Sequence, residues 1–559
     1  MLVYGDAEST MPTRDALADL KTGSERLART VLGLAWHEAA VALFIDMAAV
    51  AQGLADAEYA QRGLDDISPT QEQIMAALRG LARVVQQSWR SGFARQEPVV
   101  GTMPYLFGAL PPTVTLKRCE GYAFYGLYPE TYLEAARDLP EGCIVIGLRS
   151  IGTGLAALVA AASDAWAVVT VRPAGPPFSR SVDAGPELER LVSGNLHRSF
   201  VIADEGPGLS GSSFGGTADW LEALGVPRDR IIFMPSHDGD LGPKASERHR
   251  ARWAESDRRV RSFDHIFLNP GAAAPLHGWF RDITGDLDRP PEDISGGGWA
   301  HGQTDVPTSP SREARKFRLT GENGRFVAKF VGVDRHARAK FDRARALHEA
   351  GFCIEPLALR YGFMLEPEID GAPTRDIPIA HVAEYCRFRR DSFPAAKGGA
   401  TLRELRDMAE HNIRQGAPEA ARNLGERWND ERLDRLELLV EPVHVDGRMH
   451  WWEWLRIGEW ILKTDAVDHS ESHDLIGRQD ILWDIAGAIV EIAATPGDAR
   501  TLADAFTSGS PDREELLELM TVCYVAFQLG WWTFSGTQSG AARSQWYRGL
   551  VPAILAAPN

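Results

Sequence analysis

Cysteine is scarce in this chain, and the few cysteines are scattered. No two of the five form a Cys-x-x-Cys pair, and no group of histidines stands at the spacing of metal ligands. These absences argue against the common zinc sites and suit a reducing compartment. We therefore expect a cytoplasmic protein. The five are Cys119, Cys143, Cys353, Cys386 and Cys523.

Positive charge is in deficit. The chain has 60 Lys and Arg residues against 77 Asp and Glu residues, which gives a formal net charge of −17. Proteins that bind nucleic acid regardless of its sequence take most of their affinity from a basic surface. We expect no nucleic-acid partner, although a local basic pocket is compatible with this composition.

Long apolar runs are also missing. No run approaches the roughly 18 residues that a membrane-spanning helix needs. The N-terminus is acidic and polar, where a secretory signal would start with basic residues. We expect a soluble protein with no membrane partner, and its 559 residues give room for roughly three or four domains.

The N-terminal stretch carries helix signals. Apolar residues recur at spacings of three and four over residues 32–46, and Pro69 opens another helical pattern within residues 14–89. We expect a helical segment over 1–97 that serves either as an accessory layer or as a dimer surface, so a homodimer is one option. His37 lies in this segment, where a buried packing histidine is far commoner than a catalytic one.

The most informative stretch is residues 200–213. Four apolar residues predict a short buried strand, and Asp204 and Glu205 follow at its end. A Gly/Ser loop comes next and leads into a helix over 217–224 that stops at Gly225. Such a loop and the helix N-terminus bind anions through backbone N–H groups. Two adjacent carboxylates would instead bind neighbouring hydroxyl groups or Mg²⁺.

Other strands run into loops of the same kind. Residues 143–147 lead into a Gly/Ser/Thr loop that carries an arginine, and residues 167–171 lead into a loop with Arg172 and Arg180. A further strand covers residues 230–236. Strands that alternate with helices predict an α/β fold with a doubly wound parallel sheet, whose ligands bind at the carboxyl ends of the strands. All these loops fall on that edge.

These residues together resemble the signature of the type I phosphoribosyltransferases, in which a strand runs into two acids and a Thr/Ser/Gly loop. The alternative is an ordinary Gly/Ser turn, and the paired acids at this spacing favour the family. The resemblance implies a domain over 98–290, with catalytic Asp204 and Glu205 on the ribose hydroxyls of phosphoribosyl diphosphate. It implies substrate binding by Arg149, Ser150, Gly152, Thr153, Arg172, Arg180, Gly206, Gly208, Leu209, Ser210, Gly211, Ser212 and Ser213.

The second half has a different character. A stretch rich in Pro, Gly and Ser marks a linker over 291–312. Residues 316–330 predict a hairpin that turns at Glu322-Asn323-Gly324. A charged helix follows over 338–350. We predict an α+β domain over 313–559.

This half resembles the aminoglycoside-phosphotransferase or choline-kinase type of protein-kinase-like fold. Lys329, in Val-Ala-Lys-Phe, matches the lysine that binds nucleotide phosphates. The resemblance implies that Asp342 or Glu349 is its partner on the helix. Glu366 and Glu368 would lie at the nucleotide-binding hinge.

Further along, His444-Val445-Asp446 resembles the catalytic loop of that family, which makes Asp446 the catalytic residue. Asp465, 19 positions later, matches the metal-binding Asp, and Asp480 and Asp484 match the helix that closes the site. Where the family has a metal-binding Asn, this chain has Trp451. Glu453 would replace that ligand, because carboxylate oxygen is acceptable to Mg²⁺.

The altered ligands and a weak glycine-rich loop leave two interpretations of the second half, an active kinase or a pseudokinase that only binds. A structural alternative is a buried, Trp-rich edge at residues 451–454 with solvated carboxylates. The two resemblances together predict an enzyme that transfers a phosphoribosyl group to a base-like acceptor, or removes it by phosphorolysis, with Mg²⁺. The coupled kinase-like half would use ATP as a co-substrate, and the partners would be small molecules from nucleotide-like metabolism.

Two alternatives keep the same folds. In one, the second half binds nucleotide and regulates the first. In the other, both halves sense nucleotides and neither reacts. The sequence identifies neither the acceptor base nor the direction of the reaction.

Overall fold

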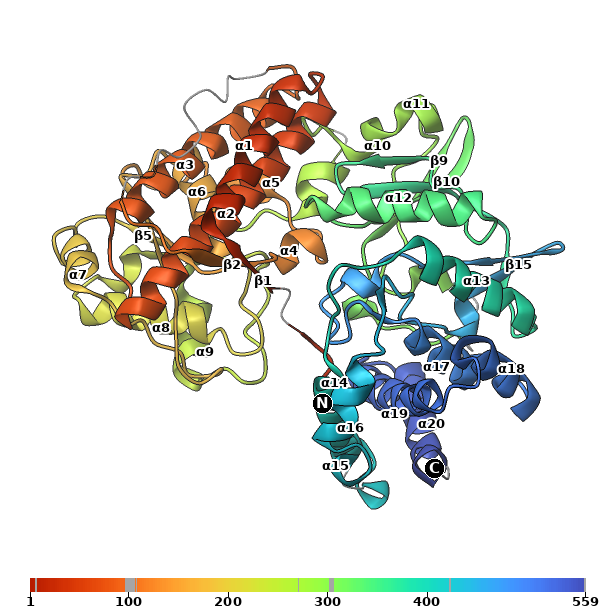
Figure 1. Cartoon of the computed structure of the whole chain (residues 1–559). Helices are drawn as coiled ribbons and strands as arrows, with labels where there is room; N and C mark the ends of the chain where they lie inside the picture. The colour runs from red at the N-terminus through yellow and green to blue at the C-terminus, as the bar shows by residue number, and fades with distance from the viewer. Residues whose placement is uncertain are drawn as a thin grey trace.

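The chain forms two parts that lie side by side, the first drawn in red to yellow and the second in green to blue (Figure 1). The first contains a parallel sheet and the second contains antiparallel sheets, so the expected mixed α/β architecture is confirmed at this level. This computed structural model describes residues 1–5, 8–95, 106, 108–269, 271–300, 306–421 and 424–556.

A five-stranded parallel sheet forms the centre of the first part, in the order β4-β3-β5-β6-β7. The strand order reverses at β3, which has β4 on one side and β5 on the other. In open sheets of this kind, ligands bind at the carboxyl ends of the strands beside the reversal. The strands are β3 (Ile144–Leu148), β4 (Ala167–Val171), β5 (Phe200–Ala203), β6 (Ile231–Met234) and β7 (Asp257–Arg258).

Side chains alternate between the two faces of this sheet, because successive residues of a strand point to opposite sides. Val145 and Val201 belong to a core shared with the N-terminal helices, whereas Ile144 and Ile202 belong to a second core beside α8. The helices expected over 14–89 are confirmed, and they pack on the sheet through α6. The helices are α1 (Thr13–Arg29), α2 (Leu34–Arg62), α3 (Pro69–Arg90), α6 (Gly152–Ala162), α8 (Ser212–Ala223) and α9 (Glu247–Glu255).

Helix α2 departs from the expected lack of long apolar runs, because its length and composition would allow it to cross a membrane. However, 72% of its apolar window is buried inside the structure, as in the core helix of a folded domain. His37 on this helix is buried, and its Nε2 lies 2.7 Å from Glu130 Oε1. This is the packing role that the sequence favoured for His37.

The N-terminal residues connect the two parts. Strand β1 (Glu8–Pro12) pairs with β2 (Thr113–Lys117) in the first part. Residues 1–5 instead reach the second part, where the backbone N–H of Leu2 donates to Asn412 Oδ1 at 2.6 Å. The predicted helical segment therefore begins with residues that belong by contact to the second part.

The second part opens with a small antiparallel sheet in the order β11-β12-β10-β9-β8. The predicted hairpin is confirmed: β9 and β10 are joined by Glu322 and Asn323, and Gly324 has a positive φ of 126° that favours glycine. Helix α12 (His336–Glu349) follows it. The strands are β8 (Glu292–Asp293), β9 (Lys316–Gly321), β10 (Gly324–Phe330), β11 (Ala358–Arg360) and β12 (Phe363–Pro367).

Residues on the N-terminal side of the predicted linker also pack on this small sheet. Helix α11 (Arg281–Thr284) contacts β9 and β10, and Trp279 of α10 (Leu276–Trp279) packs against Phe363. Strand β8, inside the predicted linker, extends the sheet at one edge. The boundaries at 290 and 312 stay predictions, and residues 301–305 of the linker lie outside the described residues.

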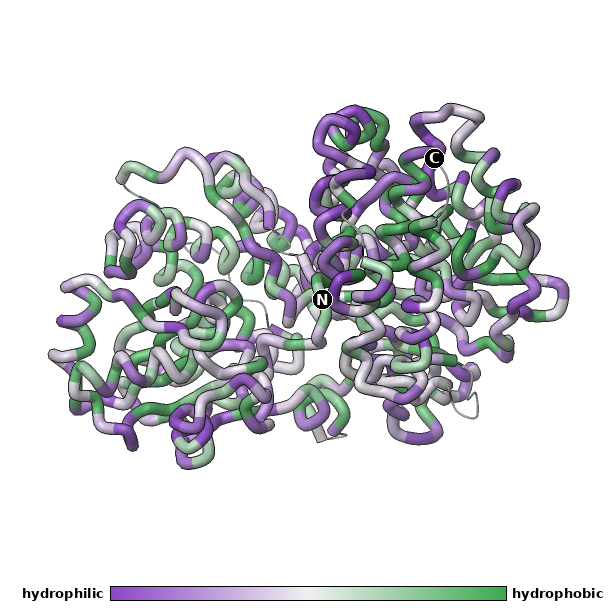
Figure 2. Tube along the Cα trace, turned by 90° about the horizontal axis from the view of Figure 1, so that it is seen from below, coloured by the Kyte–Doolittle hydropathy of each residue, from purple (hydrophilic) through white to green (hydrophobic). Residues whose placement is uncertain are grey.

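Helices make up most of the remainder and enclose a separate core. Figure 2 shows hydrophobic stretches through the interior of both parts and hydrophilic stretches along the outer helices. Two short strands, β15 (Trp454–Ile457) and β16 (Trp460–Lys463), form a hairpin beside this core. The helices include α13 (Ile379–Ser392), α14 (Leu402–Gly416), α17 (Leu482–Glu491), α18 (Pro496–Thr507), α19 (Pro511–Thr533) and α20 (Gln538–Ala556).

Candidate functional site

A cavity of about 450 Å³ lies between the small antiparallel sheet and the loops around β15 and β16. Tyr4, Phe124 and Tyr125 from the N-terminal side also line it. The cavity thus collects residues from β10, β12 and both ends of the β15–β16 hairpin. The predicted nucleotide and metal residues that line it are Lys329, Glu366, Glu368, Glu453 and Asp465.

Lys329 is the basic centre of this cavity. Its Nζ donates hydrogen bonds to the carboxylates of Asp465 and Asp468. Burial alone would raise the pKa of both acids, but the neighbouring positive charges, with Lys329 the largest among them, together hold both pKa values below their usual range. The sequence reading missed Asp468, which lies 139 positions from Lys329.

The two predicted hinge acids differ in their surroundings. Burial raises the pKa of Glu366 to about 7, with Lys329 acting in the opposite direction. Glu368 accepts a hydrogen bond from Arg318 Nε at 2.7 Å. The protonation of Glu366 can therefore change near neutral pH.

The expectation that Lys329 pairs with an acid of helix α12 is wrong. Asp342 and Glu349 lie on the exposed face of α12, where they pair with arginines of the same helix. The face toward the cavity carries bases instead, and Lys340 Nζ lies 3.0 Å from Asp468 Oδ1. The acids that face Lys329 come from the loop after β16. Asp342 and Glu349 are seven residues apart, so they share the outward face of α12, where each pairs with the arginine four residues before it.

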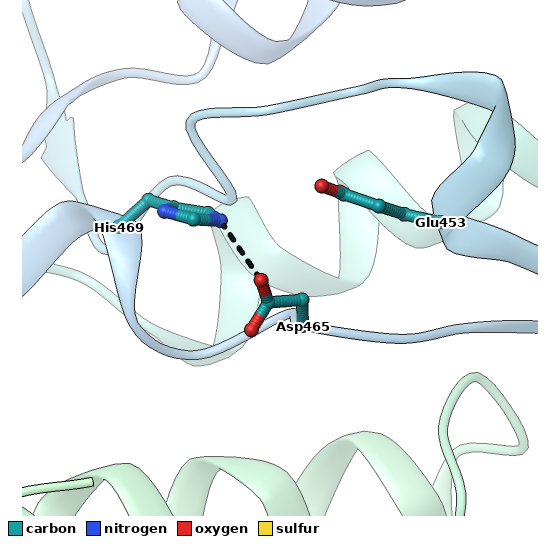
Figure 3. Close-up of side chains that lie close together, drawn as sticks. All are labelled: Glu453, Asp465 and His469. Atoms are coloured by element: carbon teal, nitrogen blue, oxygen red, sulfur yellow. Dashed lines mark ion pairs between the residues drawn. The ribbon is translucent and has the colours of Figure 1, made fainter. Parts of the chain in front are cut away.

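Glu453, Asp465 and His469 form a cluster beside Lys329. One ligand atom from each lies within 4.8 Å of the others, and Figure 3 shows the three side chains pointing toward one another. The first two are the predicted metal residues. His469 was missed, since only its spacing of four from Asp465 could have signalled it. The carboxylate oxygens and the imidazole nitrogen fit a divalent cation.

Asp446, the predicted catalytic residue, is fully buried and is not among the described residues that line the cavity. Its Oδ2 accepts a hydrogen bond from Tyr385 and lies 3.3 Å from Lys463 Nζ. Lys463 also donates to Glu453 Oε2 at 2.7 Å. Lys463, which sequence reasoning missed, thus separates Asp446 from the cavity.

The loop that carries Asp446 is held from behind by α17. Asp484 on this helix accepts the backbone N–H groups of Asp446 and Gly447 at 2.8 and 2.9 Å. Asp480 instead binds Arg513. The predicted helix is present from Leu482 and its Asp484 holds the loop, but Asp480 lies before it, in the short strand β17 (Gln479–Asp480).

The acidic pair of the first part lies at the carboxyl end of β5. Burial raises the pKa of Asp204 to about 7. Burial, together with the negative charges of Asp204 and Glu120, raises the pKa of Glu205 to about 8. The backbone N–H of Gly121 donates to Glu205 Oε2 at 3.2 Å. Glu205 and Ser150 line one cavity of about 240 Å³, so two loops predicted to share a ligand do meet.

The loop between β5 and α8 turns through two glycines, Gly208 and Gly211, with φ values of 61° and 60°. Its hydroxyl groups are partly used inside the protein. Ser210 Oγ accepts from the backbone N–H of Ser212 at 3.2 Å, and Ser212 Oγ donates to a backbone carbonyl at 3.0 Å. The phosphate role of this loop stays a prediction. The remaining predicted residues on it are Gly206, Leu209 and Ser213.

Arg149 and Arg172 do not face an open anion site. The side chain of Arg149 is fully buried, and its Nε donates to Asp56 Oδ1 at 2.8 Å. Asp65 accepts from the same guanidinium group, and Asp56 also accepts from Arg172. Both arginines are paired with carboxylates of the N-terminal segment. The prediction had paired them with the diphosphate of a substrate. The reason is the packing of α2, which the local sequence does not reveal.

The other predicted residues of this edge, Arg180, Gly152 and Thr153, lie in three different environments. Arg180 is exposed on its loop, and its charge acts to lower the pKa of Asp204 against the larger effect of burial. Gly152 passes close to β5, where a Cβ would lie 2.7 Å from Ala203 O. Thr153 is buried in α6. Of Arg180, Gly152 and Thr153, only Gly152 is required by the backbone geometry, because a side chain there would collide with β5.

No protein-family model and no curated protein matches this chain. Among solved structures it is similar to a choline/ethanolamine kinase family protein from Mesorhizobium loti, with 17% identity, a TM-score of 0.32, and coverage of 44% of this chain and 86% of that one. It is also similar to the choline kinase LicA from Streptococcus pneumoniae, with 14% identity, a TM-score of 0.29, and coverage of 43% and 89%.

A third similar structure is a spectinomycin phosphotransferase in complex with ADP and spectinomycin, with 13% identity, a TM-score of 0.32, and coverage of 51% and 94%. These three are kinase-type proteins. TM-scores this low do not support assigning the activity of these proteins to this chain. No finding supports the resemblance of the first part to phosphoribosyltransferases, which stays a prediction.

Proposed function

We propose that the second part binds a nucleoside triphosphate, with a divalent cation, in the 450 Å³ cavity and transfers a phosphoryl group to a small molecule. The observation that carries this proposal is the position of Lys329. Its ammonium group faces Asp465 and Asp468 beside the cluster of Glu453, Asp465 and His469. A base for phosphate and ligands for a cation thus share one cavity, which is the arrangement that phosphoryl transfer needs.

The other lining residues support a nucleotide. Trp531 and Trp532 present apolar surface to the same cavity, and aromatic side chains suit a planar base. The cation, when bound, would neutralise charge on the phosphates. Lys329 would release its acids and bind phosphate oxygens, and Asp465 would turn to the cation. Positioning and charge neutralisation supply most of the catalysis in reactions of this class.

A nucleotide-binding second part without phosphoryl transfer is the alternative, and the burial of Asp446 favours it. A base that takes a proton from a substrate hydroxyl must reach that hydroxyl. Asp446 can do so only if the Lys463 ammonium moves aside. The two versions agree on nucleotide binding and differ on turnover.

Calorimetric titration of ATP with Mg²⁺ or Mn²⁺ tests both versions. We expect binding to the wild type and its loss in Lys329→Met. Because that change removes the lysine of Asp465 and one of the two lysines at Asp468, the double variant Lys329→Met/Asp468→Asn is measured beside it, with thermal unfolding to verify the fold. Lys244→Ala, in the first part, is the control. Failure of the wild type to bind ATP would overturn the proposal. Binding of ATP with no release of ADP in the presence of any acceptor tested would favour the alternative.

Phosphoribosyl transfer by the first part is a second candidate function. It is supported by the acidic pair Asp204 and Glu205, which lies beside the reversal of strand order, and by the cavity that Glu205 shares with Ser150. It is weakened by Arg149 and Arg172, which would have to leave Asp56 and Asp65 to bind a diphosphate. Titration of phosphoribosyl diphosphate with Mg²⁺ into the wild type and into Asp204→Asn/Glu205→Gln tests it. Binding that only the wild type shows would support the candidate, and no binding would eliminate it.

A further inference from the structure

Three side chains meet at the base of the β15–β16 hairpin. Glu453 precedes β15, and Asp465 and His469 follow β16, so the hairpin brings residues from both of its ends together. One ligand atom from each lies within 4.8 Å of the other two. The imidazole of His469 and the two carboxyl groups are directed toward one another (Figure 3).

His469 is the unusual member of this cluster. Its side chain is only 10% exposed, and its Nε2 makes no hydrogen bond to any residue that the structure describes. The nearest carboxylate oxygen, Asp465 Oδ2, lies 3.6 Å away, which is longer than a hydrogen bond. A buried polar nitrogen without a partner is costly. This nitrogen therefore points to a ligand.

The two carboxylates each keep an oxygen for the same ligand. Lys329 binds Oδ1 of Asp465, so Oδ2 is directed toward His469. Lys463 binds Oε2 of Glu453 at 2.7 Å, whereas His450 Nδ1 lies 3.6 Å from Oε1, which is beyond hydrogen-bond distance. The lysines thus hold the acids in place and neutralise part of their charge without filling the centre of the cluster.

The loop that carries Asp446 passes close to the base of the His469 side chain. Gly447 has a φ of 84°, and a Cβ at this position would lie 2.9 Å from the Cβ of His469. Only glycine adopts this backbone conformation readily and leaves that space free. The position of His469 is therefore fixed by the loop next to the candidate catalytic residue.

We propose that Glu453, Asp465 and His469 bind one divalent ion of the first transition series in preference to Mg²⁺. Mg²⁺ takes oxygen ligands almost exclusively, whereas an imidazole nitrogen beside carboxylates suits transition metals. For a mixed nitrogen and oxygen site the affinity rises from Mn²⁺ to Co²⁺. Three protein ligands leave positions open for water or for phosphate oxygens. The inference names the cation of the proposed function and rests on that function only for the role of the ion.

The test measures metal binding by the full chain without nucleotide. Protein freed of metal with a chelator is titrated with Co²⁺, followed by visible absorption, and with Mn²⁺, followed by loss of the free-ion signal in electron paramagnetic resonance. Mg²⁺ is measured by competition. We expect one site with affinity rising in the order Mg²⁺, Mn²⁺, Co²⁺. In His469→Gln we expect Co²⁺ binding to weaken by about tenfold or more, because even an outer-shell partner is commonly worth that much.

His473→Gln is the matched control, because His473 lines the same cavity and contacts Tyr125 but is not in the cluster. It should leave the metal affinities unchanged. Equal affinity for Mg²⁺ and Co²⁺, or Co²⁺ binding that His469→Gln leaves intact, would overturn the proposal.

If His469→Gln does not fold, a measurement on the wild type still tests whether His469 is a metal ligand. Electron spin echo modulation of bound Mn²⁺ should reveal coupling to a histidine nitrogen, and its absence would overturn the proposal. ATP binding is measured separately with Lys329→Met. Binding of Co²⁺ without binding of ATP would support the metal site and overturn the proposed function. Binding of ATP without binding of Co²⁺ would support nucleotide binding and overturn the metal site.

Discussion

The ammonium group of Lys463 lies 3.3 Å from Asp446 Oδ2. The same group donates to Glu453 Oε2 at 2.7 Å, so one buried cation connects the candidate catalytic acid to the metal cluster. Both Lys463 and Asp446 are fully buried in their side chains. Each charge therefore depends on the other for compensation, and neither can be removed without consequences for the second part.

We expect Lys463→Met to destabilise the second part strongly. Removal of one partner of a buried ion pair costs about 3 to 5 kcal/mol. Without Lys463, Asp446 keeps Arg389 Nη1 at 3.9 Å, but Glu453 Oε2 loses its hydrogen-bond donor. The measurement is urea unfolding followed by tryptophan fluorescence. Lys397→Met, an exposed lysine of the same part, should change the free energy of unfolding by no more than about 0.5 kcal/mol. Equal stability of both variants would show that Lys463 is not needed for compensation.

Asp484 provides a second prediction, on the loop of Asp446. Its carboxylate accepts two backbone N–H groups at 2.8 and 2.9 Å. In Asp484→Asn the amide can accept only through its oxygen, so one N–H loses its partner at a cost of about 1 to 3 kcal/mol. We expect phosphoryl transfer to fall while ATP affinity is kept, because the nucleotide residues lie elsewhere.

Steady-state kinetics and calorimetric titration measure these two effects. Asp434→Asn, on an exposed helical face, is the control and should change neither quantity. A loss of ATP affinity in Asp484→Asn equal to the loss of turnover would contradict the proposed separation, since it would mean that the variant damages the whole cavity.

The acidic pair of the first part predicts a pH dependence of stability. Burial and the charges of Asp204 and Glu120 raise the pKa of Glu205 from an ordinary value of 4.5 to about 8. The folded state therefore binds more protons than the unfolded state between those two pH values. Stability due to this group is fully present below pH 4.5 and is lost as the pH rises toward 8, with a slope of at most about 1.4 kcal/mol per pH unit.

Thermal unfolding of the wild type and Glu205→Gln across this range measures the effect. The variant cannot ionise, so its stability relative to the wild type should increase with pH. Glu187→Gln, an exposed acid of the same part, should give a curve parallel to the wild type. A parallel curve for Glu205→Gln would mean that Glu205 titrates at its ordinary pKa.

Local patterns in the sequence predicted much of the fold. The strand of residues 200–203 is an apolar run bounded by acids and glycine, and the structure has β5 at these positions. The hairpin turn at Gly324 was also predictable, because a positive φ favours glycine. Such features depend on neighbours in the chain, so they can be read without knowledge of the packing.

Long-range pairing could not be read in the same way. Asp65 lies 84 positions from Arg149, and Asp468 lies 139 positions from Lys329. Whether an arginine meets a substrate phosphate or a carboxylate of another helix is decided by how the helices pack. The sequence predicted that Lys329 and Asp465 belong to one site, and both line one cavity, but it could not show that Lys463 pairs with Asp446.

The contact of Tyr361 with Glu130 gives the last prediction, on how the two parts are joined. Tyr361 Oη donates to Glu130 Oε1 at 2.7 Å, and His37 Nε2 lies 2.7 Å from the same oxygen. All three side chains are buried. Tyr361 lies in the turn between β11 and β12 of the second part, whereas Glu130 and His37 belong to the first. Tyr361→Phe should therefore weaken the contact between the parts, at a cost of about 1 to 3 kcal/mol.

Differential scanning calorimetry distinguishes weaker contact from a local defect. If the contact couples the two parts, Tyr361→Phe should separate the unfolding of the first part from that of the second, because each part has further core of its own. Tyr125→Phe, which removes a half-exposed hydroxyl near His473, should leave the unfolding profile as in the wild type. A profile in which Tyr361→Phe lowers the midpoint of one part alone would show that the buried network stabilises that part and does not join it to the other.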